Sequence, residues 1–299
     1  MLLERTYDQT SLGLIAAKAR DYAQLSKLRL SSMVVFSATM GALLAAHGSI
    51  NLVHISLLML GGLLVTASSN ALNQVIERDF DKLMSRTAAR PLPQKRMSVV
   101  EALLFAGLCG VGGIIILWYF FNPVAGMLGA IALLSYSFIY TPLKRISPIA
   151  VLVGAIPGAI PPMIGWVSVS GTISIEAFTL FSIQFLWQFP HFWAIAWVAH
   201  DDYMKAGFKL LPSNHGKNRF SALQNIIYIA ILIPVSLIPF VMGWAGAISA
   251  FVAVICGGVF LVQAIQLYIK LNDDYARKLM FGSFVYLPVV FLSLVLDKI

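Results

Sequence analysis

The sequence predicts an all-α, polytopic membrane protein: one domain built as a bundle of nine transmembrane helices. Hydrophobic residues make up 59% of the 299 residues and charged residues only 11%, whereas soluble domains carry about 25% charged residues. The mean hydropathy is +0.83. Segments of about 18 or more residues, nearly free of charge, recur along the chain and are each long enough to cross a bilayer. The predicted spans are 28–46, 52–72, 99–119, 123–140, 149–169, 175–199, 222–242, 244–269 and 279–296.

The positive charge of the chain is distributed as membrane topology requires. The net charge is +8, from 21 Lys and Arg residues against 13 Asp and Glu. A cytoplasmic N-terminus places five segments inside, namely 1–29, 73–98, 141–148, 200–221 and 270–278, and these hold every Lys and Arg except Lys298. Inner loops rich in Lys and Arg are typical of membrane proteins. We therefore predict an inside N-terminus, an outside C-terminus and anionic ligands, and no binding of nucleic acid.

The N-terminal segment 1–27 is predicted to be cytoplasmic. Apolar residues between positions 11 and 25 have helical spacing, which indicates a helix lying on the inner membrane surface, in contact with membrane lipid. We expect no cleavable signal peptide, and three acidic residues in this segment argue against an organellar transit peptide. Cys109 and Cys256 each lie in an apolar span and predict neither a disulfide nor a zinc site. A bacterial inner membrane is the expected location.

A polar stripe follows the second predicted span. Asn73, Glu77 and Asp81 recur every four residues, which spreads them over about 80° of one helical face at about 100° per residue. Carboxylate and amide oxygens are ligands of Mg²⁺, which usually takes one or two carboxylates together with substrate phosphates. We therefore predict a site for a Mg²⁺-bridged diphosphate. A solvated helix end is the alternative interpretation of the same stripe.

Helix geometry limits how this stripe binds metal. Asn73 and Asp81 are about 12 Å apart along a helix that rises about 1.5 Å per residue, whereas Mg–oxygen bonds are about 2.0–2.1 Å long. We therefore expect Asn73 and Glu77 to bind one Mg²⁺, with Asp81 acting through water or through a second ion shared with Asp202. Asp202 closes the sixth predicted span, beside Asp201.

Basic residues recur on the same predicted side of the membrane as the stripe. Arginine binds phosphate oxygens as a planar fork and lysine binds them as a point charge. Lys and Arg just outside a span are also typical topology anchors, which is the alternative interpretation. The residues that we predict to bind diphosphate are Lys27, Arg86, Arg90, Lys144 and Arg145.

The fifth predicted span contains six helix-breaking residues. Irregular backbone at membrane depth is tolerated only against protein or a cavity. We expect this span to line a pocket, and close helix packing through small residues is the alternative. The six residues are Gly154, Pro157, Gly158, Pro161, Pro162 and Gly165.

His191 lies in the sixth predicted span, directly after Pro190. An ionisable side chain inside the membrane is costly unless it faces the protein interior, so it is a candidate functional residue. A structural, hydrogen-bonded histidine is the alternative.

Several of these motifs occur in the order typical of one enzyme family. The pattern N-x-x-x-[DE]-x-x-x-D, then M-x-R-T-x-x-R-P-L, is matched by Asn73, Glu77, Asp81, Met84, Arg86, Thr87, Arg90, Pro91 and Leu92, and Y-x-x-x-K-R is matched by Tyr140, Lys144 and Arg145. The chain resembles the UbiA family of intramembrane prenyltransferases over most of residues 25–297. One branch of that family farnesylates heme. The chain resembles this branch in segments 158–166, 187–193, 202–212 and 286–288.

The resemblance implies a nine-helix bundle whose active site opens near the cytoplasmic face. It implies Mg²⁺ as cofactor, farnesyl diphosphate and heme b as substrates, and delivery of the product toward a heme A synthase or a terminal oxidase assembly. It further implies that an allylic cation forms near Tyr140 and reacts with a heme vinyl group, and that His191 orients heme by iron ligation or hydrogen bonding. One departure concerns Asp202, because many members carry D-x-x-x-D there and this chain does not.

Two other functions stay open from the sequence. A related prenyltransferase acting on an aromatic acid or quinone precursor would keep the diphosphate residues and change only the acceptor pocket. A membrane transporter would also suit nine spans with broken helices. Transporters commonly place acidic residues near the membrane midplane, whereas the acidic residues of this chain cluster at one predicted face.

Overall fold

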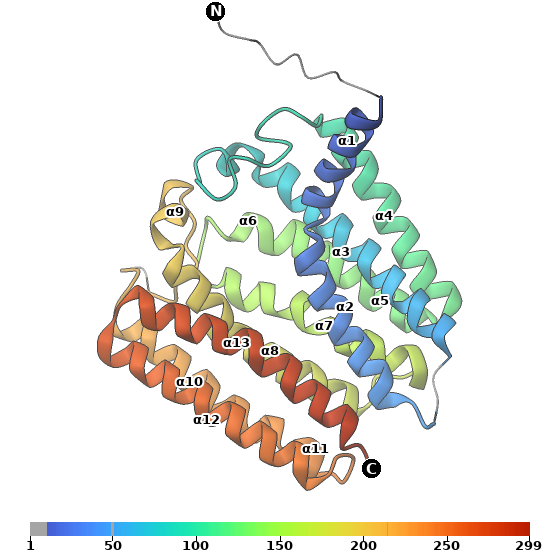
Figure 1. Ribbon diagram of the computed structural model, residues 1–299, viewed down its shortest axis with the longest axis vertical. Helices are drawn as coiled ribbons and strands as arrows, with labels where there is room; N and C mark the ends of the chain where they lie inside the picture. Colours follow the sequence, from blue (N-terminus) through green and yellow to red (C-terminus); the bar gives the residue numbers. More distant parts are fainter. Residues whose placement is uncertain (1–10, 49–50, 214) are drawn as a thin grey trace, which may run out of the picture.

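A computed structural model describes residues 11–48, 51–213 and 215–299, which form an all-α bundle (Figure 1). The first ten residues of the predicted N-terminal segment lie outside these ranges. The helices are α1 Ser11–Ser26, α2 Leu28–Ala45, α3 Leu52–Asp81, α4 Val99–Phe120, α5 Pro123–Leu134, the π-helix η1 Ser135–Tyr140, α6 Thr141–Leu143, α7 Ala150–Ser170, α8 Ile175–Val198, α9 His200–Lys205, α10 Arg219–Ser236, α11 Ile238–Val241, α12 Ala247–Lys270 and α13 Asp273–Leu296. Helices α1 and α9 lie at one end of the bundle, and α11 and the C-terminus lie at the other (Figure 1).

Eight spans within the described ranges are long and apolar enough to cross a membrane. They consist of α2, α3, α4, α5 with η1 and α6, α7, α10 with α11, α12 and α13. Helix α8 corresponds to the predicted span 175–199 but is not among these eight. It is 24 residues long, and it carries Gln184, Gln188 and His191. The structure therefore shows a polytopic membrane fold with eight candidate spans.

Polar caps set where most of the long helices begin. Five helices are each preceded by a residue whose side chain accepts a hydrogen bond from a backbone N–H of the first turn. These capping residues are Asn51, Ser98, Asn122, Asn218 and Asn272. These caps satisfy donors that have no partner inside the helix. The start of each of these helices is therefore set locally, by a single capping residue.

Helix α7 is the central element of the bundle and packs against α2, α5 and α8. It stays helical through Pro157, Pro161 and Pro162. Because Pro162 has no N–H, the carbonyl of Gly158 lacks its usual helical donor. Gln184 on α8 supplies one instead, with Nε2 donating to the Gly158 carbonyl at 2.7 Å. Gln184 of α8 therefore replaces the backbone donor that Pro162 lacks.

Two glycines let α2 and α7 approach closely. A Cβ on Gly165 would collide with the backbone carbonyl of Ala38, and one on Gly41 would collide with that of Pro162. Helices in lipid associate through packing at such small residues rather than through exclusion of water. The fifth predicted span thus packs closely against α2 at Gly165. It also lines an apolar cavity.

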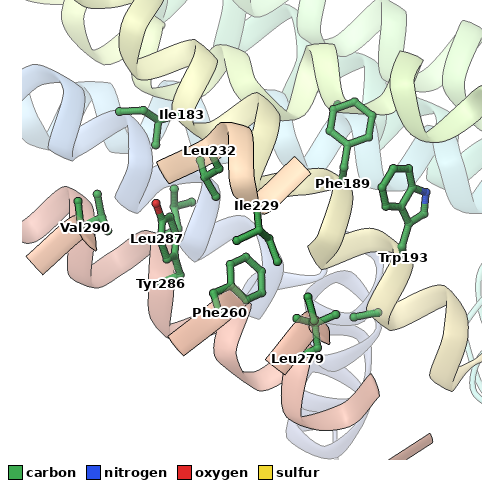
Figure 2. Close-up of a cluster of buried hydrophobic side chains, with 14 of the residues drawn as sticks. Ile183, Phe189, Trp193, Ile229, Leu232, Phe260, Leu279, Tyr286, Leu287 and Val290 are labelled. Atoms are coloured by element: carbon green, nitrogen blue, oxygen red, sulfur yellow. The ribbon is translucent and has the colours of Figure 1, made fainter. Parts of the chain in front are cut away.

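The second half of the chain forms its own packed cluster. Figure 2 shows side chains of four helices interlocking at its centre: Ile183, Phe189 and Trp193 of α8, Ile229 and Leu232 of α10, Phe260 of α12, and Leu279, Tyr286, Leu287 and Val290 of α13. The Tyr286 hydroxyl lies 2.9 Å from Ser236 Oγ, so its polar atom is paired. This cluster holds α8 in place against α13.

Candidate active site

The polar stripe predicted from the sequence lies on the last turns of α3. Asn73, Glu77 and Asp81 are 1%, 5% and 0% exposed. Helix α3 continues past the apolar segment to Asp81, so the three side chains stay on one continuous helix and share a face. Buried carboxylates require partners. Each side chain of the stripe contacts a basic residue.

Asn73 connects Lys27, just before α2, to the start of α6. Its Oδ1 accepts a hydrogen bond from Lys27 Nζ at 3.2 Å, and its Nδ2 donates to Thr141 Oγ1 at 3.1 Å. Lys27 adopts a left-handed backbone conformation between α1 and α2. Thr141 in turn donates to the carbonyl of Tyr136 at 2.9 Å. The two contacts fix the Asn73 amide with its oxygen toward Lys27.

Glu77 forms a buried ion pair with Lys144. Lys144 Nζ lies 2.8 Å from Glu77 Oε1, and the side chains are 9% and 6% exposed. The ammonium group also lies 4.6 Å from the centre of the Tyr140 ring. The Lys144 carbonyl accepts a hydrogen bond from the backbone N–H of Lys209 at 2.7 Å. Lys144 therefore connects α3 to the segment that follows α9.

Asp81 is held by the basic loop, residues 82–98, that follows α3. Arg90 Nη1 contacts both carboxylate oxygens, at 2.9 and 2.7 Å. Thr87 Oγ1 donates to the Asp81 carbonyl at 2.9 Å. Met84 and Leu92 are buried and anchor the loop in the protein. The loop therefore folds back over the end of its own helix.

Asp202 contacts the basic loop rather than the stripe. Its two carboxylate oxygens accept the backbone N–H groups of Ser85 and Arg86, at 3.0 and 3.2 Å. Lys205 Nζ lies 3.1 Å from Asp202 Oδ1. The Ser85 N–H, together with that of Arg86 and the Lys205 side chain, lowers the pKa of Asp202 to about 2. In this arrangement Asp202 joins α9 to the loop.

The two remaining predicted basic residues lie at the rim on aromatic rings. Arg145 is exposed, with its guanidinium 3.9 Å from the centre of the Phe80 ring. Arg86 is also exposed, and its Nη2 donates to the Tyr203 hydroxyl at 3.4 Å. Neither forms an ion pair within the described ranges. Both guanidinium groups therefore keep donors available at the entrance to the cluster.

Lys27 is half-buried and Lys144 is buried, and both have shifted pKa values. Burial, and then the charges of Arg90 and Lys144, lower the pKa of Lys27 to about 7. Burial also lowers the pKa of Lys144, but Glu77 and Tyr140 raise this pKa by more than burial lowers it. The pKa of Lys144 therefore lies above its ordinary value. The pKa values of the two lysines are therefore shifted in opposite directions.

The donor set at this site fits Mg²⁺ chemically. Asn73, Glu77 and Asp81 supply hard oxygen donors. No group of three or more His, Cys, Asp or Glu side chains is placed to hold a metal ion by itself in the parts of the chain that the structure describes. An ion that takes part of its shell from substrate phosphates matches this arrangement, because it needs only one or two carboxylates.

An apolar cavity of about 110 Å³ is lined mainly by α2, α3, η1 and α7, with Leu117 of α4 and Ala132 of α5. Leu58, Leu117 and Ile164 line its apolar part, and Asn70 and Tyr136 also line it. Asn70 lies three residues before Asn73 on α3, and the Tyr136 ring lies 5.2 Å from that of Tyr140. The cavity thus adjoins the polar cluster.

A second cavity, of about 220 Å³, has a different lining. It is formed around Trp166, Trp244 and Lys298 and contacts none of the predicted site residues. Although this cavity is the larger, the cavity that adjoins Asn73 has the chemistry relevant to the site.

His191 lies between α8 and α13. Its Nδ1 is 2.8 Å from Ser283 Oγ, and its ring stacks on Trp187 at 4.5 Å. Ser283 Oγ donates its only proton to the carbonyl of Met280 at 2.6 Å. The hydroxyl therefore accepts from His191, so Nδ1 carries the ring proton and Nε2 keeps its lone pair.

Sequence reasoning missed several residues of this cluster. Thr141, Tyr136 and Tyr203 contact predicted site residues but were not singled out. Thr141 and Tyr136 belong to the turns around the predicted Y-x-x-x-K-R motif, and a polar residue between Tyr140 and Pro142 was the available signal. Tyr203 directly follows Asp202. Nothing in the sequence pattern indicated that it reaches Arg86.

The fold and the cluster together indicate a membrane enzyme that acts on a prenyl diphosphate. Comparisons with known proteins agree with this class of enzyme. Residues 34–292 match the UbiA prenyltransferase family. The chain belongs to this family.

Two relatives from different bacteria are named protoheme IX farnesyltransferase. The chain is 47% identical over 285 residues to a protoheme IX farnesyltransferase of Cytophaga hutchinsonii, covering 95% of this chain and 100% of the relative. It is also 47% identical to a protoheme IX farnesyltransferase of Christiangramia forsetii, covering 93% of each chain.

Solved structures share the fold at low identity. A digeranylgeranylglyceryl phosphate synthase matches with a TM-score of 0.78 at 18% identity, over 94% of this chain and 98% of that one. A UbiA homologue from Archaeoglobus fulgidus, bound to GPP and Mg²⁺, matches with a TM-score of 0.63 at 16% identity, over 92% and 99% of the two chains. These likenesses confirm the predicted all-α membrane fold of the UbiA type.

Proposed function

We propose that the chain transfers the farnesyl group of farnesyl diphosphate to a vinyl group of heme b, giving heme O. Relatives with the name protoheme IX farnesyltransferase, 47% identical over nearly the whole chain, support this acceptor and donor. The reaction also consumes one water. The diphosphate leaves with the electron pair of its allylic C–O bond, the farnesyl carbon bonds to the vinyl carbon, and hydroxide from water adds to the other vinyl carbon as a proton is released.

One observation carries the proposal: each member of the buried stripe contacts a basic side chain. Lys27 contacts Asn73, Lys144 contacts Glu77, and Arg90 contacts Asp81. A bound divalent ion supplies new partners for the oxygens of the stripe, and a diphosphate supplies new partners for the three cations. Charges are then exchanged between partners rather than left unpaired in a buried site, where an unpaired charge is costly.

We assign the roles of the side chains from this exchange. Mg²⁺, when bound, would neutralise charge that develops on the leaving diphosphate. Asn73 and Glu77 would hold it, and Asp81 would contribute through water or through a second ion. Asp202 was expected to share that ion, but we assign it to holding the basic loop, because both of its oxygens accept loop N–H groups.

The basic side chains receive the diphosphate in this scheme. Lys27, Lys144 and Arg90 contact it inside the cluster, and Arg86 and Arg145 contact it from the rim. Donors placed where negative charge grows on the leaving group would lower the barrier to ionisation.

The farnesyl chain occupies the apolar cavity between α2, α3, η1 and α7. The rings of Tyr136 and Tyr140 lie between that cavity and Lys144, where their faces stabilise an allylic cation electrostatically. The cavity has few polar side chains, so water has limited access to the cation before the vinyl group reacts.

His191 is the residue that we assign to heme. Its Nδ1 is paired with Ser283, which would leave Nε2 to ligate iron. A hydrogen bond to the second ring nitrogen is the support that metal-binding histidines usually have.

For topology we propose nine crossings, with α8 as the ninth, in a bacterial inner membrane with the N-terminus inside. The stripe, the basic loop and α9 then face the cytoplasm, together with nearly all Lys and Arg residues, as the positive-inside pattern requires. The product would pass to a heme A synthase or to the assembly of a terminal oxidase.

The proposal is tested by mass spectrometry of heme. The purified protein in detergent is incubated with heme b, farnesyl diphosphate and Mg²⁺, and we expect a product heavier by one farnesyl and one hydroxyl group. A quinone precursor is the matched alternative acceptor. Prenylation of that precursor with unchanged heme would establish the aromatic prenyltransferase instead, and absence of any transfer would refute both. Because detergent solution holds no gradient, transfer there excludes a transporter.

A further inference from the structure

Arg96, outside the predicted diphosphate set, joins α1 to the basic loop. Its Nε donates to Asp21 Oδ1 at 2.9 Å, and its Nη2 donates to Gln24 Oε1 at 3.1 Å and to the carbonyl of Ala89 at 3.2 Å. Asp21 and Gln24 belong to α1, and Ala89 belongs to the loop. One guanidinium group therefore contacts both elements at once.

The Ala89 carbonyl belongs to the peptide unit that presents Arg90. A peptide unit is planar, so fixing its carbonyl and its N–H fixes its orientation. Arg96 holds the carbonyl of this unit, and the Arg90 N–H donates to the Thr87 carbonyl at 3.0 Å. The Arg90 side chain begins at the end of this unit and reaches both oxygens of Asp81. Arg96 thus fixes the starting point of the Arg90 side chain.

Helix α1 is itself held firmly enough to act as a support. Asp21 is only 7% exposed. On the other side, Gln74 Nε2 on α3 donates to the carbonyl of Leu25 at 2.7 Å, and Asn70 Nδ2 donates to that of Ser26 at 3.0 Å. These amides satisfy carbonyls at the C-terminal end of α1, which otherwise have no helical partner. The helix is therefore tied to α3, the same helix that carries the stripe.

We propose that Arg96 and Asp21 form a positioning pair, through which α1 sets the Arg90 guanidinium for diphosphate binding. On this view α1, predicted from the sequence as a helix on the membrane surface, is part of the framework of the active site. Arg96 touches no substrate and acts through the peptide unit between Ala89 and Arg90. The inference rests on the proposed function, since it concerns how that site holds diphosphate.

The test measures binding of inorganic pyrophosphate with Mg²⁺ to the purified full chain by calorimetry, and KM and kcat for farnesyl diphosphate. Arg96→Met should weaken pyrophosphate binding and raise KM by about tenfold, the size expected when one charge-assisted contact is lost, with kcat changed much less. Arg96→Lys keeps the charge but cannot reach all three acceptors, so its effect should be intermediate. Asp21→Asn should show the same KM-selective change on a smaller scale.

Tyr22→Phe is the matched control, because it loosens α1 without touching the loop. Tyr22 OH donates to Glu101 Oε1 on α4 at 2.8 Å, and its loss should leave KM unchanged. An equal rise in KM in Tyr22→Phe, or unchanged KM in Arg96→Met, would overturn the positioning role. Should Arg96→Met fail to fold, Arg96→Lys with wild-type KM would overturn it equally. Failure of the unaltered protein to bind pyrophosphate would instead refute the proposed function.

Discussion

The buried pair of Glu77 and Lys144 allows stability and function to be separated. Both side chains are less than 10% exposed and lie 2.8 Å apart. Glu77→Gln leaves a buried ammonium without its counter-ion, and Lys144→Met leaves a buried carboxylate without its own. Removing one partner of such a pair costs about 3–5 kcal/mol, whereas replacing both with uncharged groups is often neutral or stabilising.

We therefore expect each single variant to lose about 3–5 kcal/mol of unfolding free energy and the double variant to recover most of that loss. Denaturant titration of the protein in detergent measures this, and pyrophosphate binding with Mg²⁺ is measured on the same samples. The double variant should be folded and stable but should not bind Mg²⁺-pyrophosphate. Additive losses of stability in the double variant would refute the coupling of the pair, and retained binding would remove both residues from the site.

Three further predictions concern other parts of the molecule. Gly165→Ala should destabilise the protein by about 1–3 kcal/mol or more in thermal unfolding, because the new Cβ meets the Ala38 carbonyl; an unchanged midpoint would show that α2 and α7 are not in close contact. Gly62→Leu should fill the apolar cavity, which Gly62 lines, and should raise KM for farnesyl diphosphate more than for geranyl diphosphate; equal changes would place the prenyl chain elsewhere. His191→Ala should alter the heme absorption spectrum and reduce transfer, and a variant that keeps both would exclude this residue from the heme site.

The sequence was sufficient for the class of fold and for the family. Low charge and long apolar segments predicted an all-α membrane protein, and the ordered motifs from Asn73 onward indicated the UbiA family, which the comparisons confirm. Hydropathy marks only the part of a helix that lies in lipid, however. It ended the second span at position 72, whereas α3 continues to Asp81, and that extension carries the stripe.

Pairing between distant residues was beyond what the sequence could provide. Lys144 and Glu77 are 67 residues apart, and nothing in their local pattern selects one for the other. Asp202 was expected near metal because acids close its helix, yet its oxygens accept the loop N–H groups. The spacing of apolar residues in α1 indicated a helix on the membrane surface. It did not indicate that Asp21 pairs with Arg96, which lies 75 residues away in the sequence. Such contacts depend on how helix ends converge, which is a tertiary property.

The central claim is that the stripe on α3 holds a divalent ion together with diphosphate. Electron paramagnetic resonance of Mn²⁺, used in place of Mg²⁺ with pyrophosphate and the purified protein, tests this most directly. We expect phosphorus hyperfine coupling on protein-bound Mn²⁺ that disappears in Glu77→Gln. Bound Mn²⁺ without phosphorus coupling, or coupling that is unchanged in Glu77→Gln, would contradict the account.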